Sequence, residues 1–228
     1  MTTVPFAEGG VTRIRRETKI LLEPEEASRL AGRLAAEIAP YECRVACVYF
    51  DSPDGKLARR AATTPDDCVK IRTRSYDPDL GDRPGRVALD VKRERGGITS
   101  KDRLWLPPED VPAEVRRALA PTFGAIAPTV ASTYRRRVFQ ASPEWRATFD
   151  DELRFHAAGW SLFAPGTRPS LASLAPPFAG ERLVVLELKH APGALPAWLV
   201  ELGRARGIAY SKFAAGSRDA GRVGSSGA

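Results

Sequence analysis

Acidic and basic residues recur in this sequence as pairs separated by a single residue. The pairs are Glu17/Lys19, Asp90/Lys92 and Glu187/Lys189, with an all-basic version at Lys70/Arg72/Arg74 and an inverted version at Arg146/Thr148/Asp150. Guanidinium groups bind phosphate oxygens through paired hydrogen bonds, and lysine adds a mobile point charge. Carboxylates together with phosphate oxygens suit Mg²⁺ or Mn²⁺. These residue types can therefore hold a metal-bound phosphate compound, although the acids could instead only neutralise the neighbouring lysines.

The whole chain is basic. Its 228 residues contain 35 Lys and Arg against 28 Asp and Glu, a formal charge of +7. Such an excess favours a polyanionic partner, which could be nucleic acid, an anionic membrane surface or a phosphorylated small molecule. Composition does not choose among these three.

No stretch of about 18 apolar residues occurs, so no membrane-spanning segment is expected. The first ten residues lack a basic region followed by an apolar one, which would mark a secretory signal. We therefore expect a cytoplasmic protein.

The charged pairs lie in segments that alternate between apolar and charged residues. In the segment 68–76, Val69 and Ile71 alternate with Lys70 and Arg72, and this period of two predicts a strand with one apolar and one charged face. For any single strand, a charged face is commonly just solvated. Because the charges recur in phase on several segments, we expect the apolar faces to turn outward, under helices, and the charged faces to line the interior.

The remaining pattern predicts many strands and few helices, which is typical of a barrel or a sandwich. Strands are expected at 11–22, 44–51, 68–76, 86–95, 98–106, 128–140, 144–156 and 181–190, and helices at 24–40, 55–62, 108–120 and 195–206. Residues 1–10 are expected to be a flexible N-terminus, 11–216 a single domain, and 217–228 a disordered tail rich in Gly and Ser.

Eight short stretches follow one another in the order of a known family. They are RRETK, VYFDS, KIRTRSY, LDVKRERGG followed by Lys101, TYRRRVFQ, RATFD, VLELKH and SKF, and they span about Arg16 to Phe213. In these stretches the chain resembles the VTC domain, the polyphosphate polymerase domain of the vacuolar transporter chaperone. That domain is one of the triphosphate tunnel metalloenzymes, which also include the CYTH proteins.

The resemblance implies an α+β fold, a closed antiparallel β-tunnel of about eight strands with helices packed on the outside. It implies a phosphotransferase that moves the terminal phosphate of ATP to polyphosphate, with Mn²⁺ or Mg²⁺ as cofactor. ATP, polyphosphate or triphosphate would be its partners, and no specific nucleic acid is expected. Coupling to a membrane would require a separate membrane protein.

The resemblance and the strand pattern together single out the site residues. The expected phosphate-binding set is Lys19, Lys70, Arg72, Arg74, Lys92, Lys101, Tyr134, Arg136, Arg146, Lys189, Ser211 and Lys212. Within it, the catalytic residues would be Lys19, Arg72, Arg74, Lys92 and Arg136. The metal ligands would be Glu187 first, together with Asp90, Asp150 or Glu17.

Two positions depart from the family pattern. Asp90 stands where the family usually has Glu, which shortens the side chain by one methylene. Ala209 stands where polymerases place a lysine. The second departure weakens the case for polymerase activity.

Two alternatives to a polymerase remain open. An inorganic triphosphatase or polyphosphate hydrolase would use the same groups with water as the acceptor. A non-catalytic polyanion-binding or nucleic-acid-binding module would bind without turnover. Nucleic-acid recognition usually adds exposed aromatic residues or a recognisable helix motif, and the sequence shows neither.

Overall fold

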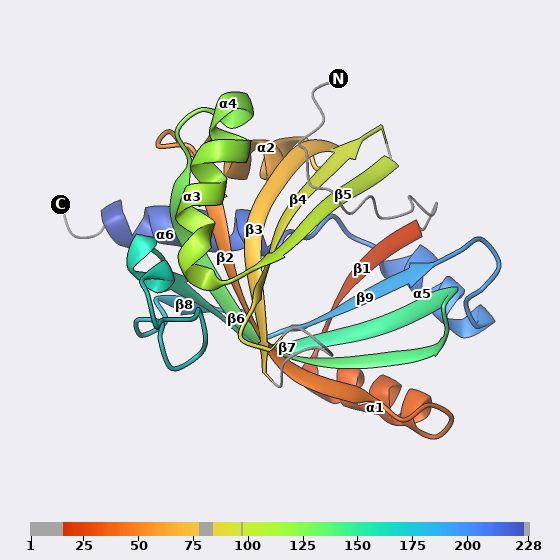
Figure 1. Ribbon diagram of the computed structural model, residues 1–228. Helices are drawn as coiled ribbons and strands as arrows, with labels where there is room; N and C mark the ends of the chain where they lie inside the picture. Colours follow the sequence, from red (N-terminus) through yellow and green to blue (C-terminus); the bar gives the residue numbers. More distant parts are fainter. Residues whose placement is uncertain (1–15, 78–83, 97, 226–228) are drawn as a thin grey trace.

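One antiparallel sheet organises the computed structural model, which describes residues 16–77, 84–96 and 98–225 (Figure 1). In the described residues the strand order is β1-β9-β7-β6-β2-β3-β4-β5, and the two-residue strand β8 pairs with β7. The strands are β1 (Arg16–Leu22), β2 (Tyr41–Asp51), β3 (Asp67–Asp77), β4 (Val87–Arg95), β5 (Ile98–Leu106), β6 (Ala127–Ser142), β7 (Trp145–Ala157), β8 (Ala179–Gly180) and β9 (Val184–His190).

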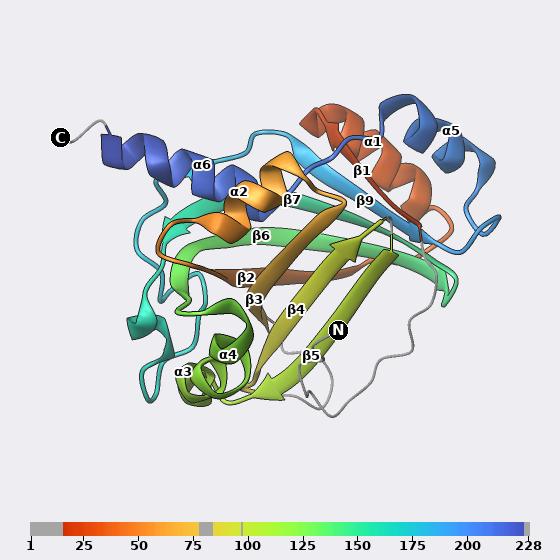
Figure 2. The ribbon, with the colours of Figure 1, turned by 90° about the horizontal axis from the view of Figure 1, so that it is seen from above.

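Helices connect the strands and cover the outer surface of the sheet (Figures 1 and 2). The main ones are α1 (Pro24–Ala35), α2 (Lys56–Thr63), α5 (Ala197–Arg206) and α6 (Lys212–Ser225). The connection from β5 to β6 contains η1 (Pro108–Asp110), α3 (Val111–Glu114), the π-helical turn η2 (Val115–Leu119) and α4 (Ala120–Phe123). The short helix η3 (Trp160–Phe163) follows β7. Pro24 starts α1, and Glu25 and Glu26 lie in its first turn, where carboxylates favour a helix N-terminus. No helix in the described part of the chain is both long and apolar enough to cross a membrane.

Helix α6 differs from the sequence-based expectation. A disordered tail was predicted from residue 217, whereas α6 continues to Ser225. The hydroxyl of Ser211 accepts a hydrogen bond from the backbone N–H of Ala214 at 3.4 Å, as an N-terminal cap does. Phe213 is buried and its ring stacks on Tyr49 with 5.0 Å between centroids. This packing stabilises a helix that composition alone does not favour. The expected flexible N-terminus, residues 1–10, lies outside the described residues.

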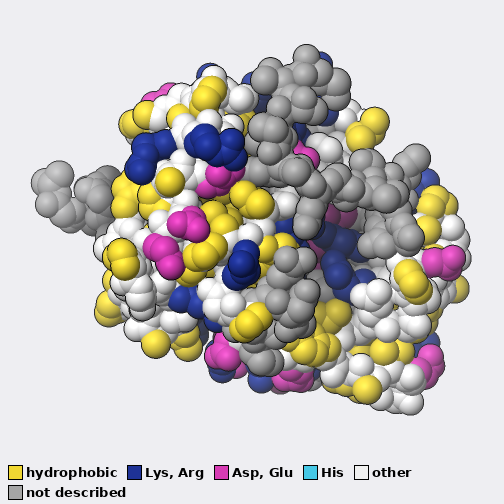
Figure 3. All heavy atoms as spheres, in the orientation of Figure 1, with side chains coloured by type: hydrophobic (Ala, Val, Ile, Leu, Met, Phe, Trp, Pro, Cys, Tyr) yellow, Lys and Arg dark blue, Asp and Glu magenta, His cyan; other side chains and the backbone are white. Residues whose placement is uncertain are grey.

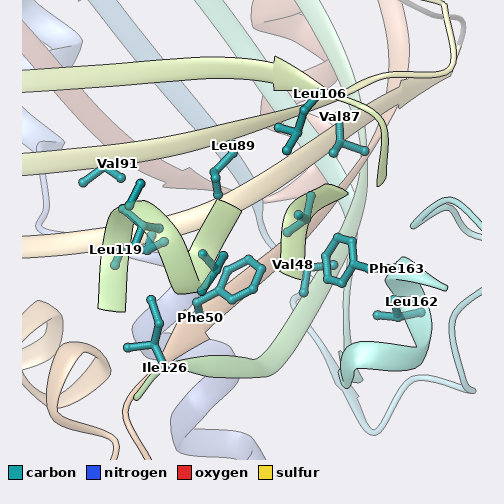
Figure 4. Packing of buried hydrophobic residues seen from close by; sticks show 14 of the residues in the cluster. Val48, Phe50, Val87, Leu89, Val91, Leu106, Leu119, Ile126, Leu162 and Phe163 are labelled. Atoms are coloured by element: carbon teal, nitrogen blue, oxygen red, sulfur yellow. The ribbon is translucent and has the colours of Figure 1, made fainter. Parts of the chain in front are cut away.

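Apolar side chains on the outer face of β3 and β4 pack under the connection between β5 and β6. Leu89 and Val91 of β4 are fully buried against Leu119, as Figure 4 shows, and Ile71 of β3 and Val115 belong to the same cluster. Burying one such side chain contributes roughly 1.5–3 kcal/mol. The helical connection is therefore held on the outside of this part of the sheet.

The other half of the sheet is covered in the same way. Ile20, Leu186 and Leu188 of β1 and β9 are fully buried in a cluster with Ala31 of α1 and Leu199 of α5. The predicted inversion is thus confirmed, because the apolar faces turn outward under helices on both halves. The charged faces consequently turn inward.

The sheet is strongly curved, but its closure into a tunnel is not confirmed. Figures 1 and 2 show the arm formed by β3, β4 and β5 bending toward the arm formed by β1 and β9. Among the described residues, the terminal strands β1 and β5 have no register with each other. Side chains bridge the arms instead, since the Lys92 ammonium lies 3.3 Å from the Glu17 carboxylate. What the structure establishes is an α+β fold with a deeply curved antiparallel sheet.

Candidate functional site

The concave face of the sheet encloses a cavity of about 1260 Å³. Figure 3 shows Lys and Arg side chains gathered in a recess of the surface, beside residues drawn in grey. All the residues predicted to bind phosphate line the cavity: Lys19, Lys70, Arg72, Arg74, Lys92, Lys101, Tyr134, Arg136, Arg146, Lys189, Ser211 and Lys212. Their location agrees with the prediction, while their role in binding stays a prediction.

Strand register places the cations of β3, β4 and β5 in rows. Lys70 pairs with Lys92, which pairs with Lys101, so three lysines stand side by side on neighbouring strands. Paired residues on neighbouring strands have Cβ atoms about 4.5–5.5 Å apart, and like charges placed opposite each other are destabilising. Within the described residues, neither Lys70 nor Lys101 forms an ion pair with a carboxylate. An anion in the cavity would relieve this repulsion.

The opposite arm mixes acids with bases. Glu17 of β1 pairs in register with Lys189 of β9, and Lys19 pairs with Glu187. The ammonium of Lys189 lies 2.7 Å from Glu187 and 3.2 Å from Glu17, and that of Lys19 lies 3.0 Å from Glu17. Burial and Glu187 would both raise the pKa of Glu17, but Lys189, Lys19 and Lys92 outweigh them and lower it to about 2.

The pKa of the Glu187 carboxyl is also held low. Burial would raise this pKa, but the cations Lys189, Lys19 and Arg136 bring it well below its ordinary value. Because their pKa values are low, the carboxyls of Glu17 and Glu187 are both ionised at neutral pH. Both residues line the cavity. They come from neighbouring strands, so the two carboxylates offer their charge to the same part of the cavity.

Two ionised carboxylates fit a divalent ion that also binds phosphate. Mg²⁺ is commonly held by one or two carboxylates together with waters and substrate phosphates. In the described ranges no group of three or more His, Cys, Asp or Glu residues is suited to hold a metal ion. The site thus fits a metal ion that arrives with a phosphate ligand better than one bound by the protein alone.

Asp90 and Asp150, the other two predicted metal ligands, are placed differently. Both are fully buried behind the cavity wall. Asp150 accepts hydrogen bonds from Arg136 Nε and Lys212 Nζ, each at 2.6 Å. Burial would raise the pKa of Asp150, but these two cations lower it. A metal ion at either carboxylate would have to displace cations that already occupy its oxygens.

Tyr134 lies beneath two of the cavity cations. Its ring centroid is 5.2 Å from the guanidinium carbon of Arg136 and 4.8 Å from Lys212 Nζ, so both cations face its π-system. Its hydroxyl lies 3.5 Å from the sulfur of Cys47. Tyr134 therefore supports the cations of the wall, and it lines the cavity as predicted.

Arg103 is the main lining residue that the sequence analysis missed. It lies on β5 two residues after Lys101, and its register partner on β4 is Asp90. Its guanidinium bonds that carboxylate, with Nε donating to Oδ1 at 2.7 Å. The spacing of two residues from Lys101 was the available signal, because residues two apart on a strand share a face.

Comparisons with known proteins agree with this architecture. The family model described as VTC domain matches residues 11–122 and 123–219. Among curated proteins no relative is found. Three solved structures share the fold. A Hippeastrum protein named a putative adenylyl cyclase, and described as having a dominant triphosphatase activity, is 14% identical with a TM-score of 0.52, over 91% of this chain and 95% of the other. A Bacillus halodurans protein named a putative adenylate cyclase is 12% identical with a TM-score of 0.50 (85% and 87% of the two chains), and a Pyrococcus horikoshii protein is 9% identical with a TM-score of 0.50 (91% and 99%).

At identities this low, the solved structures are evidence for the fold alone. The family match is broader, since it covers nearly all of the described chain and includes every predicted site residue. The resemblance to the VTC domain that was drawn from the sequence motifs is confirmed by this match. With its curved sheet and its cation-lined concave face, the chain belongs to the VTC domain family.

Proposed function

We propose that the protein is a metal-dependent phosphotransferase that moves the terminal phosphate of ATP to a growing polyphosphate. The observation that carries this proposal is the charge of the cavity. Among the described residues, ten predicted lysines and arginines and Arg103 line it, against two lining carboxylates, Glu17 and Glu187. A ligand that matches this surface has many negative charges in a small volume, as a phosphate chain does.

The cavity residues suit the chemistry of phosphoryl transfer. This reaction needs positioning of the reactants and stabilisation of charge on the non-bridging oxygens, rather than covalent catalysis by the protein. The guanidinium groups of Arg72, Arg74 and Arg136 orient the phosphates by paired hydrogen bonds, and Lys19 and Lys92 add mobile positive charge. A divalent ion between the phosphates and Glu17 or Glu187 would neutralise further charge when bound.

The transfer itself balances without any further reactant. A terminal oxygen of the polyphosphate attacks the γ-phosphorus of ATP, the bond from that phosphorus to the β,γ-bridging oxygen breaks, and ADP leaves. The product is a polyphosphate longer by one unit. A cavity of about 1260 Å³ exceeds the range of about 300–1,000 Å³ that is usual for small-molecule sites, which leaves room for the nucleotide phosphates and an acceptor chain.

Hydrolysis of triphosphate or polyphosphate is the second candidate function. It is favoured by Ala209, which removes a lysine that the polymerases of the family carry just ahead of α6. The dominant triphosphatase activity described for the Hippeastrum protein of the same fold points in the same direction. Water would then replace polyphosphate as the acceptor, and the cations would serve unchanged.

Product analysis separates these functions. The purified protein is incubated with ATP and Mn²⁺, and in a second reaction with tripolyphosphate and Mn²⁺, and the products are resolved by chromatography and gel electrophoresis. A phosphotransferase gives ADP with long polymer, whereas a hydrolase gives orthophosphate and no polymer. Tight binding of tripolyphosphate without either product would indicate a non-catalytic polyanion-binding module.

A further inference from the structure

One buried carboxylate lies at the centre of three arginines in the cavity wall. Asp90 is fully buried, and its Oδ2 accepts hydrogen bonds from Arg74 Nε at 2.9 Å and Arg74 Nη2 at 2.6 Å. From the other side, Arg103 donates through Nε to Oδ1 at 2.7 Å and through Nη2 to Oδ2 at 3.2 Å. The Nε of Arg72 lies 3.5 Å from Oδ2.

Strand register produces this arrangement. Asp90 on β4 stands opposite Arg72 on β3 and opposite Arg103 on β5, and Arg74 is two residues further along β3. All of them therefore share the inner face of the sheet. The short aspartate side chain keeps the carboxylate at the wall, while the longer arginine side chains reach past it to line the cavity.

The arginines retain hydrogen-bonding capacity toward the cavity. A guanidinium group carries five N–H donors, and in the described part of the chain Arg74 and Arg103 bond Asp90 only through Nε and Nη2. The side chain of Arg103 is 23% exposed, whereas that of Asp90 is fully buried. One negative charge among three positive ones leaves a net positive charge facing the cavity.

We propose that Asp90 is a positioning residue, which orients Arg74 and Arg103 toward the phosphate chain, and that Arg103 is a further phosphate-binding residue. This inference rests on the proposed function in that its ligand is a phosphate chain. It assigns Asp90 to the arginines instead of a metal ion. It also explains why an acid is retained in the wall of a cavity for polyanions, since an unanchored arginine would lose side-chain entropy on binding.

The test of Arg103 uses a matched pair of variants. Arg103→Met removes one charge from the cavity. Arg93→Met removes the same charge from the outer face of the same hairpin, where Arg93 pairs with Asp102. Binding of tripolyphosphate is measured by calorimetry at low salt with EDTA, so that no metal contributes.

We expect Arg103→Met to weaken binding at least tenfold and Arg93→Met to change it less than twofold. Arg103→Lys, which keeps the charge but loses the paired hydrogen bonds, should fall between Arg103→Met and the wild type. If the wild type binds and Arg103→Met binds equally well, the role of Arg103 is refuted while the proposed function stands. If the wild type binds only with Mn²⁺, the same comparison of Arg103→Met with Arg93→Met is made with Mn²⁺ and decides the role of Arg103. If the wild type binds tripolyphosphate neither in EDTA nor with Mn²⁺, the proposed function falls and this inference with it.

The test of Asp90 uses the sign of the effect. Asp90→Asn makes the cavity more positive, so charge alone would tighten the binding of a polyanion, and loss of a metal ligand would change nothing in EDTA. Loss of a positioning residue instead weakens binding, and we expect about tenfold. The control is Asp102→Asn, which removes the same charge on the outer face. Unchanged or tighter binding by Asp90→Asn would refute the positioning role.

Loss of stability is separated from loss of binding in both tests. Each variant is heated with and without tripolyphosphate, and the shift of the unfolding midpoint is compared with that of the wild type. A ligand that binds only the folded state raises the midpoint in proportion to its binding free energy. A variant that is less stable but binds normally therefore shows an unreduced shift, and that result would also refute its proposed role.

Discussion

Glu17 makes a strong test of the electrostatics of the cavity, because its carboxylate contacts the ammonium groups of three lysines. The distances are 3.0 Å to Lys19, 3.2 Å to Lys189 and 3.3 Å to Lys92. Burial opposes ionisation of Glu17, yet the lysines lower its pKa from 4.5 to about 2. Its side chain is 19% exposed, so screening by solvent is limited.

The size and sign of the effect follow from linkage. One pH unit corresponds to about 1.36 kcal/mol, so the lowered pKa of Glu17 contributes on the order of 3 kcal/mol of stability at pH 7. Because folding lowers this pKa, the contribution is complete well above pH 4.5 and disappears as the pH falls toward 2. Most of it should remain at pH 4, and less than half of it at pH 3.

The measurement compares urea unfolding of the wild type and Glu17→Gln at pH 7, 4 and 3. We expect the variant to be less stable by about 3 kcal/mol at pH 7 and the difference to shrink by more than half at pH 3. The control is Glu144→Gln, which changes an exposed residue of the hairpin between β6 and β7. Equal stability of Glu17→Gln and the wild type at pH 7, or a difference that does not vary with pH, would refute the reasoning.

Three further predictions concern the ligand. Arg72→Ala should weaken binding of tripolyphosphate roughly 10- to 100-fold in calorimetry while the protein stays folded, because Asp90 keeps other arginine partners; wild-type affinity would count against the site. Glu187→Gln should abolish metal-dependent turnover but retain tripolyphosphate binding in EDTA, and unchanged turnover would remove it from the metal site. Burial and the neighbouring arginines lower the pKa of Lys101 to about 8, so this lysine loses its charge between pH 7 and pH 9. Raising the pH over this range should therefore weaken tripolyphosphate binding more in the wild type than in Lys101→Gln, and equal pH profiles would contradict this.

The face of the sheet on which the site residues lie could be predicted from the sequence, because the alternation of side chains along a strand is a local property. A shift of one residue would turn Arg72, Lys92 and Lys189 from the cavity to the helix-covered face. Their alternation with buried Ile71, Val91 and Leu188 excludes that shift. The inward face was therefore readable before any tertiary contact was known.

The different partners of the acidic residues could not be predicted in the same way. Asp90 and Glu187 both occur two residues before a lysine, so their local patterns are alike. Only the pairing of β4 with β3 and β5 brings Arg74 and Arg103 to Asp90, and only the pairing of β9 with β1 brings Lys19 to Glu187. Register between strands is a long-range property, which a local pattern does not specify.

The helical state of residues 217–225 was missed for a related reason. Gly and Ser residues in that segment are typical of a linker. Its conformation depends instead on Phe213, which lies ahead of it and packs on Tyr49 of a distant strand. Tertiary packing therefore decides a local structure that composition would leave open.

Lys212, the first residue of α6, joins the cavity to the C-terminal helix. Its ammonium group lines the cavity and also bonds Asp150, the carboxylate that holds Arg136. A phosphate chain that contacts Lys212 gains this contact only while α6 is docked. Coupling of this kind is reciprocal: the free energy by which the ligand stabilises the docked helix equals the free energy by which the docked helix strengthens ligand binding. If Lys212 contacts the ligand, ligand binding should therefore stabilise α6 against local unfolding.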